Sequence, residues 1–169
     1  MKIDIEKLIV GEINLDEIDE YICLYNLVKS NMKHPEWLGD FSKDDYIRML
    51  NNNSKLYIWK YNDKIIAAGM IIPARQKDLD KFFSSNLNYE EVIDFGPELV
   101  HPNYVGNGLQ NERLKHLQRQ SKKLNYKYAI STIHPDNVYS IHNFSKNDFE
   151  QIGIIHLNRG IRGIFFKRL

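Results

Sequence analysis

The sequence predicts an α/β fold with a mixed, mostly antiparallel central sheet flanked by helices. Two runs rich in aromatic and β-branched residues, 55–61 and 64–72, are separated by Asn62-Asp63, which is a strong hairpin signal. A third run, 91–101, leads through a glycine turn into a long helical pattern, as in a parallel crossover. Two more strand-like runs end the chain, so hairpins and one crossover share the sheet, unlike a fully alternating Rossmann order.

Two helices are predicted in the first fifty residues. Asn14 with Glu17 looks like the cap of the first helix, and Ser42 with Asp45 opens the second. Cys23 lies in the first helix and is expected to be a buried packing residue rather than a nucleophile. The apolar positions at helical spacing are Ile18, Tyr21, Ile22, Tyr25 and Val28 in the first helix, and Tyr46, Ile47 and Leu50 in the second.

Two connections stand out. Residues 34–37 are predicted to form a loop, because Pro35 restricts its predecessor away from helical geometry. The polar stretch 75–90 is the longest irregular connection, with a short helix expected around 79–83. Long ordered connections often carry specificity, and a disordered surface loop explains the composition equally well.

The second half alternates helices and strands. A helix is predicted over 106–124, a strand over 126–133, a short helix from Asp136, and a final hairpin of strands 149–157 and 160–169. The side chains expected to turn inward are Leu109, Leu114, Leu117 and Leu124 in the long helix, and Val138, Ile141 and Phe144 in the short one.

Composition indicates one ordinary globular domain over residues 1–169. The chain has 43% hydrophobic and 27% charged residues, and 23 basic against 22 acidic side chains give a net charge of +1. No global field would therefore collect nucleic acid or an anionic membrane, and any anion must be bound locally. A single cysteine, no apolar run of membrane-spanning length and no leader pattern favour a cytoplasmic protein.

The most informative segment runs from Glu98 to Gln110, a strand that passes through two glycines into a helix. The first N–H groups of a helix lack internal partners and lie at the positive end of its dipole, so they can bind a phosphate. Glycines can also simply make the bend. The dinucleotide pattern GxGxxG is not met, and the Gly-Lys-Ser/Thr ending of a Walker P-loop is missing after Gly108.

Two segments resemble the motifs of the GNAT acetyltransferases. The downstream stretch 137–149 resembles motif B, N-x-x-A/S-x-x-x-Y-x-K-x-G-F, and two motifs in the right order are more specific than one. The resemblance covers 55–169, and the two N-terminal helices by order alone. The stretch that resembles motif A, in which V-x-P-x-Y leads into R/Q-x-x-G-x-G/A, is Val100-His101-Pro102-Asn103-Tyr104-Val105-Gly106-Asn107-Gly108-Leu109.

This resemblance implies an acyl-CoA cleft at a splayed pair of strands. It implies that backbone groups of Leu99 and Val100 bind the pantetheine arm and that Asn137 and Ser140 flank its end. Lys115, Arg119 and Lys146 could meet the nucleotide's phosphates, but a solvated basic face is the favoured interpretation. The N–H groups implied to bind the diphosphate belong to Val105, Gly106, Asn107, Gly108, Leu109 and Gln110.

The sequence departs from the family pattern at three positions. Val105 stands where Arg or Gln is usual, and Gln110 stands where Gly or Ala is usual, so the helix start is bulkier and cofactor binding is expected to be weaker. Phe144, implied to lie at the cofactor, replaces the usual Tyr and removes the hydroxyl that would protonate the departing thiolate. Since a thiol has a pKa of about 8.5, it can leave as thiolate, so the loss slows the reaction rather than abolishing it.

The nucleophile must be a neutral amine. Deprotonating a lysine-like amine at pH 7 costs about 4.6 kcal/mol, and an α-amine about 1 kcal/mol, so a weak base suffices for the second. Glu98, beside the implied thioester, is the candidate base, directly or through a water, and a structural carboxylate is the equally weighted alternative. His101 is a second candidate base, although the His-Pro pairs look chiefly like turn formers. No group of residues has metal-ligand spacing.

These features predict an N-acyltransferase. It would move an acetyl group from the co-substrate acetyl-CoA to a primary amine of a small molecule or peptide by direct attack. The first alternative is a non-catalytic acyl-CoA-binding sensor, since the departures at Val105, Gln110 and Phe144 suit a retired enzyme. The second is an interaction domain without a cofactor. The acceptor is not specified, and edge strands leave a homodimer open.

Overall fold

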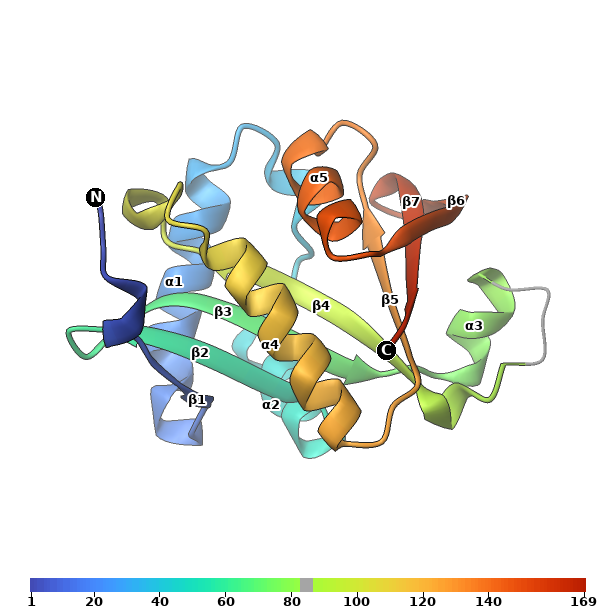
Figure 1. The fold of residues 1–169 in the computed structure, drawn as a ribbon, viewed down its shortest axis with the longest axis horizontal. Helices are drawn as coiled ribbons and strands as arrows, with labels where there is room; N and C mark the ends of the chain where they lie inside the picture. Colours follow the sequence, from blue (N-terminus) through green and yellow to red (C-terminus); the bar gives the residue numbers. More distant parts are fainter. Residues whose placement is uncertain (83–86) are drawn as a thin grey trace. The chain divides into compact units, whose positions relative to one another are not determined.

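A computed structural model describes residues 1–82 and 87–169 (Figure 1). The chain divides into two compact units. Unit 1 comprises Met1–Met70 and Pro97–Arg113, and unit 2 comprises Ile71–Gly96 and Leu114–Leu169. The expectation of a single domain over 1–169 stays a prediction, and each unit is described by itself.

Unit 1 contains the predicted hairpin. Strand β2 (Lys55–Tyr61) turns directly into β3 (Lys64–Pro73), and β1 (Ile9–Glu12) pairs antiparallel with β2. Asn62 and Asp63 have φ angles of 49° and 59°, the left-handed geometry of the two-residue turns that match strand twist. The sequence prediction of this hairpin and of its turn residues is confirmed.

The helices of unit 1 begin where capping residues predict. A 3-10 turn, η2 (Leu15–Glu17), leads into α1 (Ile18–Asn31), and α2 (Lys43–Asn51) follows the short η3 (Pro35–Trp37). Both capping boxes are present, Asn14 with Glu17 and Ser42 with Asp45. The helices pack on each other through buried aromatic rings. The ring centroids of Tyr21 and Tyr46 lie 4.8 Å apart in an edge-to-face arrangement.

One side chain of α1 differs from expectation. Cys23 is exposed and is a free thiol, so the prediction of a buried packing residue is wrong. The buried stripe of α1 consists of Ile18, Tyr21, Leu24 and Tyr25. Position 23 is two residues beyond Tyr21, and at 100° per residue this turns its side chain away from the stripe.

Unit 2 holds the C-terminal strands. Strand β4 (Val92–Val100), of which the first five residues belong to this unit, pairs parallel with β5 (Tyr128–Ile133). Strand β7 (Gly160–Arg168) pairs antiparallel with β5 on one side and with β6 (Glu150–Leu157) on the other. The complete strand order is β1-β2-β3-β4-β5-β7-β6, which confirms the mixed sheet with one parallel crossover.

The helices that flank the unit 2 strands cover an apolar core. Helix α3 (Gln76–Phe82) follows β3, η4 (Tyr89–Glu91) precedes β4, and Leu79 of α3 packs with Val92 and Ile130. The predicted helix at 79–83 thus has its counterpart in α3, with position 83 outside the described residues. Helix α5 (Val138–Lys146) follows β5.

Helix α4 (Leu109–Lys123) begins three residues later than predicted, because the glycine turn at 106–108 is not helical. Leu109, Leu114 and Leu117 are buried as expected, whereas Leu124 is exposed beyond the last turn. Val138 of α5 is also exposed, in contrast to the prediction, because it occupies the first turn of that helix. None of the described helices is long and apolar enough to cross a membrane.

We expect Ser42→Ala to lower the free energy of unfolding by about 1 kcal/mol, because the Ser42 side chain accepts the Asp45 N–H at the start of α2. Urea denaturation measures the change. Ser42→Asn is the matched control, since asparagine also caps helices. Equal losses in the two variants would contradict the capping role.

Candidate active site

The glycine turn of unit 1 joins β4 to α4. After the short η5 (Pro102–Tyr104), Gly106 and Gly108 have φ angles of 84° and 75°, which L side chains rarely adopt. A Cβ built on either glycine would meet no atom within 4 Å. The glycines are therefore needed for backbone conformation, and the space beside them is open to a ligand.

The turn presents backbone donors. Within residues 1–82 and 87–169, the N–H groups of Gly106, Gly108 and Leu109 have no hydrogen-bond acceptor, and the first bond of α4 runs from Glu112 N to Gly108 O. Both glycines are exposed. Unpaired N–H groups at the positive end of a 15-residue helix are suited to binding an anion.

The side chain of Asn107 braces the turn. Its Oδ1 accepts the Ile3 N–H at 3.1 Å, and its Nδ2 donates to the carbonyl oxygens of Met1 at 2.8 Å and Tyr104 at 2.9 Å. These bonds fix the side chain on the protein, so the backbone N–H is the group that Asn107 can offer to an anion.

The backbone of β4 distinguishes the two residues predicted to meet pantetheine. His101 donates its N–H to Ile66 O of β3 at 2.8 Å. Consecutive residues of an antiparallel strand direct their backbone groups to opposite sides, so Leu99 also faces β3 and Val100 faces away from it. The Leu99 carbonyl accepts a hydrogen bond from Arg113. Val100 therefore fits the predicted role better than Leu99.

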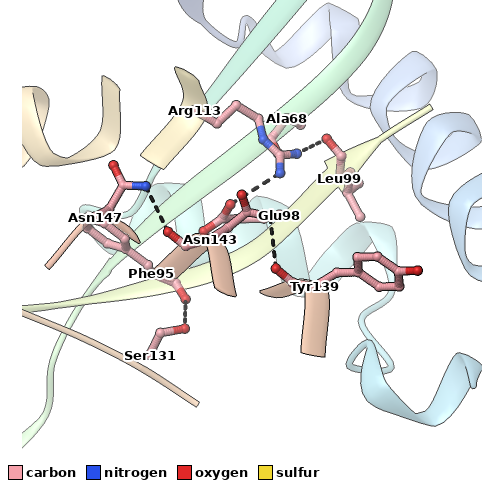
Figure 2. Close-up of polar contacts among 9 residues, drawn as sticks. All are labelled: Ala68, Phe95, Glu98, Leu99, Arg113, Ser131, Tyr139, Asn143 and Asn147. Atoms are coloured by element: carbon pink, nitrogen blue, oxygen red, sulfur yellow. Dashed lines mark hydrogen bonds and ion pairs between the residues drawn. The ribbon is translucent and has the colours of Figure 1, made fainter. Parts of the chain in front are cut away.

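Figure 2 shows an ion pair of Arg113 and Glu98 beside Leu99. Arg113 Nη2 donates to Glu98 Oε2 at 3.2 Å, with the two side chains 1% and 8% exposed. Arg113 Nη1 donates to Ala68 O at 3.0 Å and also to Leu99 O. Sequence analysis missed Arg113. Its position four residues after the inward Leu109 was the available signal, because a charged residue there must enter the buried face.

Burial controls the protonation of Glu98. Removal from water raises the pKa of Glu98 to about 7, while the neighbouring Arg113 opposes that rise. Oε2 is bound by Arg113, and Oε1 is buried without a hydrogen-bond partner. The carboxyl group is thus poised to exchange a proton near neutral pH, which is the property of a general base.

Asp94 is a partly buried carboxyl group that sequence analysis did not single out. It lies on β4 in unit 2, opposite Ile130 of β5, and burial raises its pKa to about 7. The charges of Arg75 and Arg159 oppose the rise and that of Asp78 adds to it. Glu98 lies four residues after Asp94 on the same strand, so Asp94 serves as a comparison carboxyl group with a similarly raised pKa.

The predicted motif B residues lie on α5 in unit 2. Asn137 is the N-cap, and its Oδ1 accepts the Ser140 N–H at 3.2 Å. Phe144 is buried, with its ring centroid 4.9 Å from that of Phe149 and 6.2 Å from that of Phe165. Phe144 is therefore a core residue of this unit, and Asn137 has a structural capping role whether or not a cofactor binds.

The pairing between β4 and β5 passes from backbone register pairs to a side-chain hydrogen bond within unit 2. The parallel register runs from Val92–Tyr128 to Asp94–Ile130, and beyond it Ser131 Oγ donates to Phe95 O at 3.1 Å (Figure 2). A side-chain bond thus follows the last backbone register pair. Sequence analysis did not identify Ser131, because a serine within a strand has no distinguishing local pattern.

The basic side chains considered for phosphate contacts are solvent-facing. Lys115, Arg119 and Lys146 are all exposed. This arrangement fits the favoured interpretation of a solvated basic face.

A family model for the acetyltransferase (GNAT) family matches residues 18–149, which is most of the chain. The chain belongs to the GNAT acetyltransferase family. The match includes Glu98, the glycine turn and α5, so the resemblance predicted from two motifs is confirmed at the family level. No curated protein matches this GNAT sequence.

Solved structures share the GNAT fold at low sequence identity. They include a ribosomal-protein-alanine N-acetyltransferase from Brucella melitensis. It has a TM-score of 0.76 at 14% identity, and the match covers 95% of this chain and 99% of its own. Salmonella typhimurium yncA, solved with its cofactor acetyl-CoA, has a TM-score of 0.74 at 12% identity over 96% of this chain and 94% of its own. Aminoglycoside acetyltransferase AAC(6')-Ib, solved with coenzyme A, has a TM-score of 0.71 at 17% identity over 95% and 94%.

We expect Gly106→Ala and Gly108→Ala each to lower the free energy of unfolding of this GNAT protein by about 1 kcal/mol, because a Cβ is strained at positive φ. Gly11→Ala is the control, since Gly11 has no positive φ and its Cβ would meet nothing within 4 Å. Urea denaturation measures all three. A loss in Gly11→Ala equal to the others would show that the turn conformation is not the cause.

Proposed function

We propose that this chain transfers the acetyl group of acetyl-CoA to a primary amine, and that the glycine turn binds the diphosphate of the cofactor. The observation that carries the proposal is the set of unpaired N–H groups at Gly106, Gly108 and Leu109, at the positive end of α4. With a net charge of +1, the chain has no global field to replace this local site.

The other cofactor contacts follow from the family resemblance and the backbone geometry. Val105 and Gln110 flank the turn and belong to the proposed site by resemblance alone, since the Val105 N–H already donates to Pro102 O at 3.4 Å. Val100 would bind the pantetheine arm through backbone groups that face away from β3. Asn137 and Ser140 would lie near the acyl end by resemblance alone. No metal ion enters the proposal.

Glu98 is the proposed general base. An ammonium group of the acceptor gives one proton to Glu98 Oε1, directly or through one water, and the neutral nitrogen attacks the thioester carbonyl carbon. The C–S bond breaks as the C–N bond forms, the coenzyme A thiolate leaves, and the second proton lost by nitrogen ends on the thiolate. A base whose pKa is about 7 can accept the first proton near neutral pH.

The acceptor class stays broad. One structural neighbour is named for a ribosomal-protein alanine and another for aminoglycosides, so the shared fold accommodates a peptide amine and a small-molecule amine. An α-amine is the favoured class, because its deprotonation at pH 7 costs about 1 kcal/mol against about 4.6 for a lysine-like amine.

A non-catalytic acyl-CoA sensor is the second candidate. The buried Phe144 favours it, because this side chain packs against Phe149 and Phe165 and carries no hydroxyl to protonate a thiolate. Assay of free thiol release with a panel of amines separates the two. Coenzyme A binding without turnover for any amine supports the sensor.

We expect Gly108→Asp to weaken coenzyme A binding at least tenfold, since a carboxylate at the turn repels the diphosphate. Isothermal titration calorimetry with coenzyme A and with pantetheine, which lacks the diphosphate, measures the effect. Gly108→Asn is the matched control, because asparagine has the same shape, tolerates positive φ and carries no charge. Unchanged coenzyme A affinity in Gly108→Asp, or equal affinities for the two ligands in the wild type, would overturn the diphosphate site.

We expect Glu98→Gln to lower kcat/KM by about 10²-fold or more and to remove the acid limb of its pH profile near pH 7. The sign follows from protonation, since Glu98 must lose its proton to act and is protonated below its pKa. Profiles with two amines of different pKa separate the titration of the amine from that of Glu98. Asp94→Asn is the control, as its carboxyl has a similarly raised pKa, and it should keep the limb.

A further inference from the structure

Arg113 is the most buried charged side chain of the candidate site. It is 1% exposed and donates to three acceptors, which are Ala68 O on β3, Leu99 O on β4 and Glu98 Oε2 (Figure 2). The planar guanidinium group has five donors in a fixed fork, so one side chain can bind two main-chain carbonyls and a carboxylate together.

Packing alone does not require a charge at this position. Burying a guanidinium group costs several kcal/mol, which an ion pair and hydrogen bonds offset only when the geometry is good. Leu109, one turn earlier on the same helix, is buried and apolar and fills its site without such a cost. The contacts of Arg113 therefore need an account in terms of the groups that they hold.

Arg113 holds the carboxylate of Glu98 and a main-chain carbonyl next to Val100, both of which belong to the proposed acetyl-transfer site. Arg113 occupies Oε2 of Glu98 and leaves Oε1 as the oxygen without a partner. It also binds the carbonyl of Leu99, which precedes Val100 on the strand. Arg113 lies in the second turn of α4, whose first residues carry the unpaired N–H groups of the proposed diphosphate site.

We propose that Arg113 is a positioning residue for acetyl transfer, which holds Glu98 through Oε2 and presents Oε1 as the proton acceptor. This inference rests on the proposed function and deepens it. Arg113 touches neither the amine nor the thioester in this scheme, and it acts through Glu98.

The charge of Arg113 acts on the pKa of Glu98 in a known direction. Burial raises the pKa of Glu98, and Arg113 lowers it. Around Glu98, β3 and β4 contribute the neutral carbonyls of Ala68 and Leu99 to this network, and α4 contributes the charge of Arg113. Removing that charge leaves burial unopposed, so the pKa of Glu98 rises and the base is protonated at neutral pH.

The test uses the full chain with Arg113→Met, Arg113→Lys, Glu98→Gln and the double variant Arg113→Met/Glu98→Gln. The titration of Glu98 is followed without any ligand by ¹³C NMR of its side-chain carboxyl carbon, and kcat/KM for acetyl-CoA is measured from pH 5.5 to 9.5. Urea denaturation shows which variants are folded. Arg113→Lys keeps a charge but loses the fork, so it tests the same point if Arg113→Met does not fold.

We expect Arg113→Met to raise the pKa of Glu98 by about one unit or more and to move the acid limb of kcat/KM by the same amount. Activity then falls about tenfold at pH 6 and recovers toward the wild-type value at pH 9, because a one-unit shift changes the deprotonated fraction tenfold below the pKa. Arg113→Lys should show a smaller shift. The double variant should match Glu98→Gln, since Arg113 acts through Glu98.

An unchanged pKa of Glu98, or a loss of activity in Arg113→Met that is equal at every pH, would overturn the positioning role and leave Arg113 as a structural residue. Failure of the proposed function looks different. In that case the wild type shows no turnover or does not bind coenzyme A, while the ligand-free titration still reports on the contact between Arg113 and Glu98.

Discussion

The hydrogen bonds of one buried guanidinium group determine the geometry of the candidate site in unit 1. Arg113 binds main-chain carbonyls on β3 and β4 and the Glu98 carboxylate, all with almost no exposure to water. In such surroundings each bond is stronger than in water, and each unpaired group is more costly. The strand residues and the first turns of α4 are therefore held as one hydrogen-bonded arrangement, and the remaining features of the site depend on it.

The candidate site combines two electrostatic features, the N–H groups of the glycine turn and the Glu98–Arg113 ion pair. The glycine turn offers backbone N–H groups and a helix dipole, which attract an anion without any basic side chain. Glu98 combines a desolvated carboxyl with a neighbouring cation, and the two effects act on its pKa in opposite directions. The net charge of +1 is consistent with a protein whose recognition of anions is local.

Membership in the GNAT family establishes the fold and places the chain among acetyltransferases, and the residues of the site carry the proposal for its chemistry. At the position where the motif resemblance implies Tyr, Phe144 is packed into an aromatic core of unit 2. A scheme in which the thiolate leaves without a protein acid is chemically reasonable for a group of low pKa. Neighbours of the same fold carry the names of different acceptors, so the fold alone does not specify the acceptor.

Local patterns in the sequence were enough to predict most elements of the fold. The Asn62-Asp63 turn and both capping boxes depend on a few adjacent residues, and each was found where it was predicted. The glycine turn was also predicted, although the helix after it begins three residues later than expected. Predictions that required knowing which face of a helix is covered were less successful. Cys23 and Val138 proved exposed, because helical phase and helix ends, rather than hydrophobicity, decide burial there.

The sequence by itself determined the elements, the glycine turn and the candidate base Glu98, since each is encoded within a short stretch of chain. Tertiary structure alone decided the partner of that base and its protonation. Arg113 is fifteen residues from Glu98, and Ala68 is forty-five residues from Arg113, so their contact arises only when strands and helix come together. Burial, which raises the pKa of Glu98 and of Asp94, is likewise a property of the assembled core and not of any local sequence.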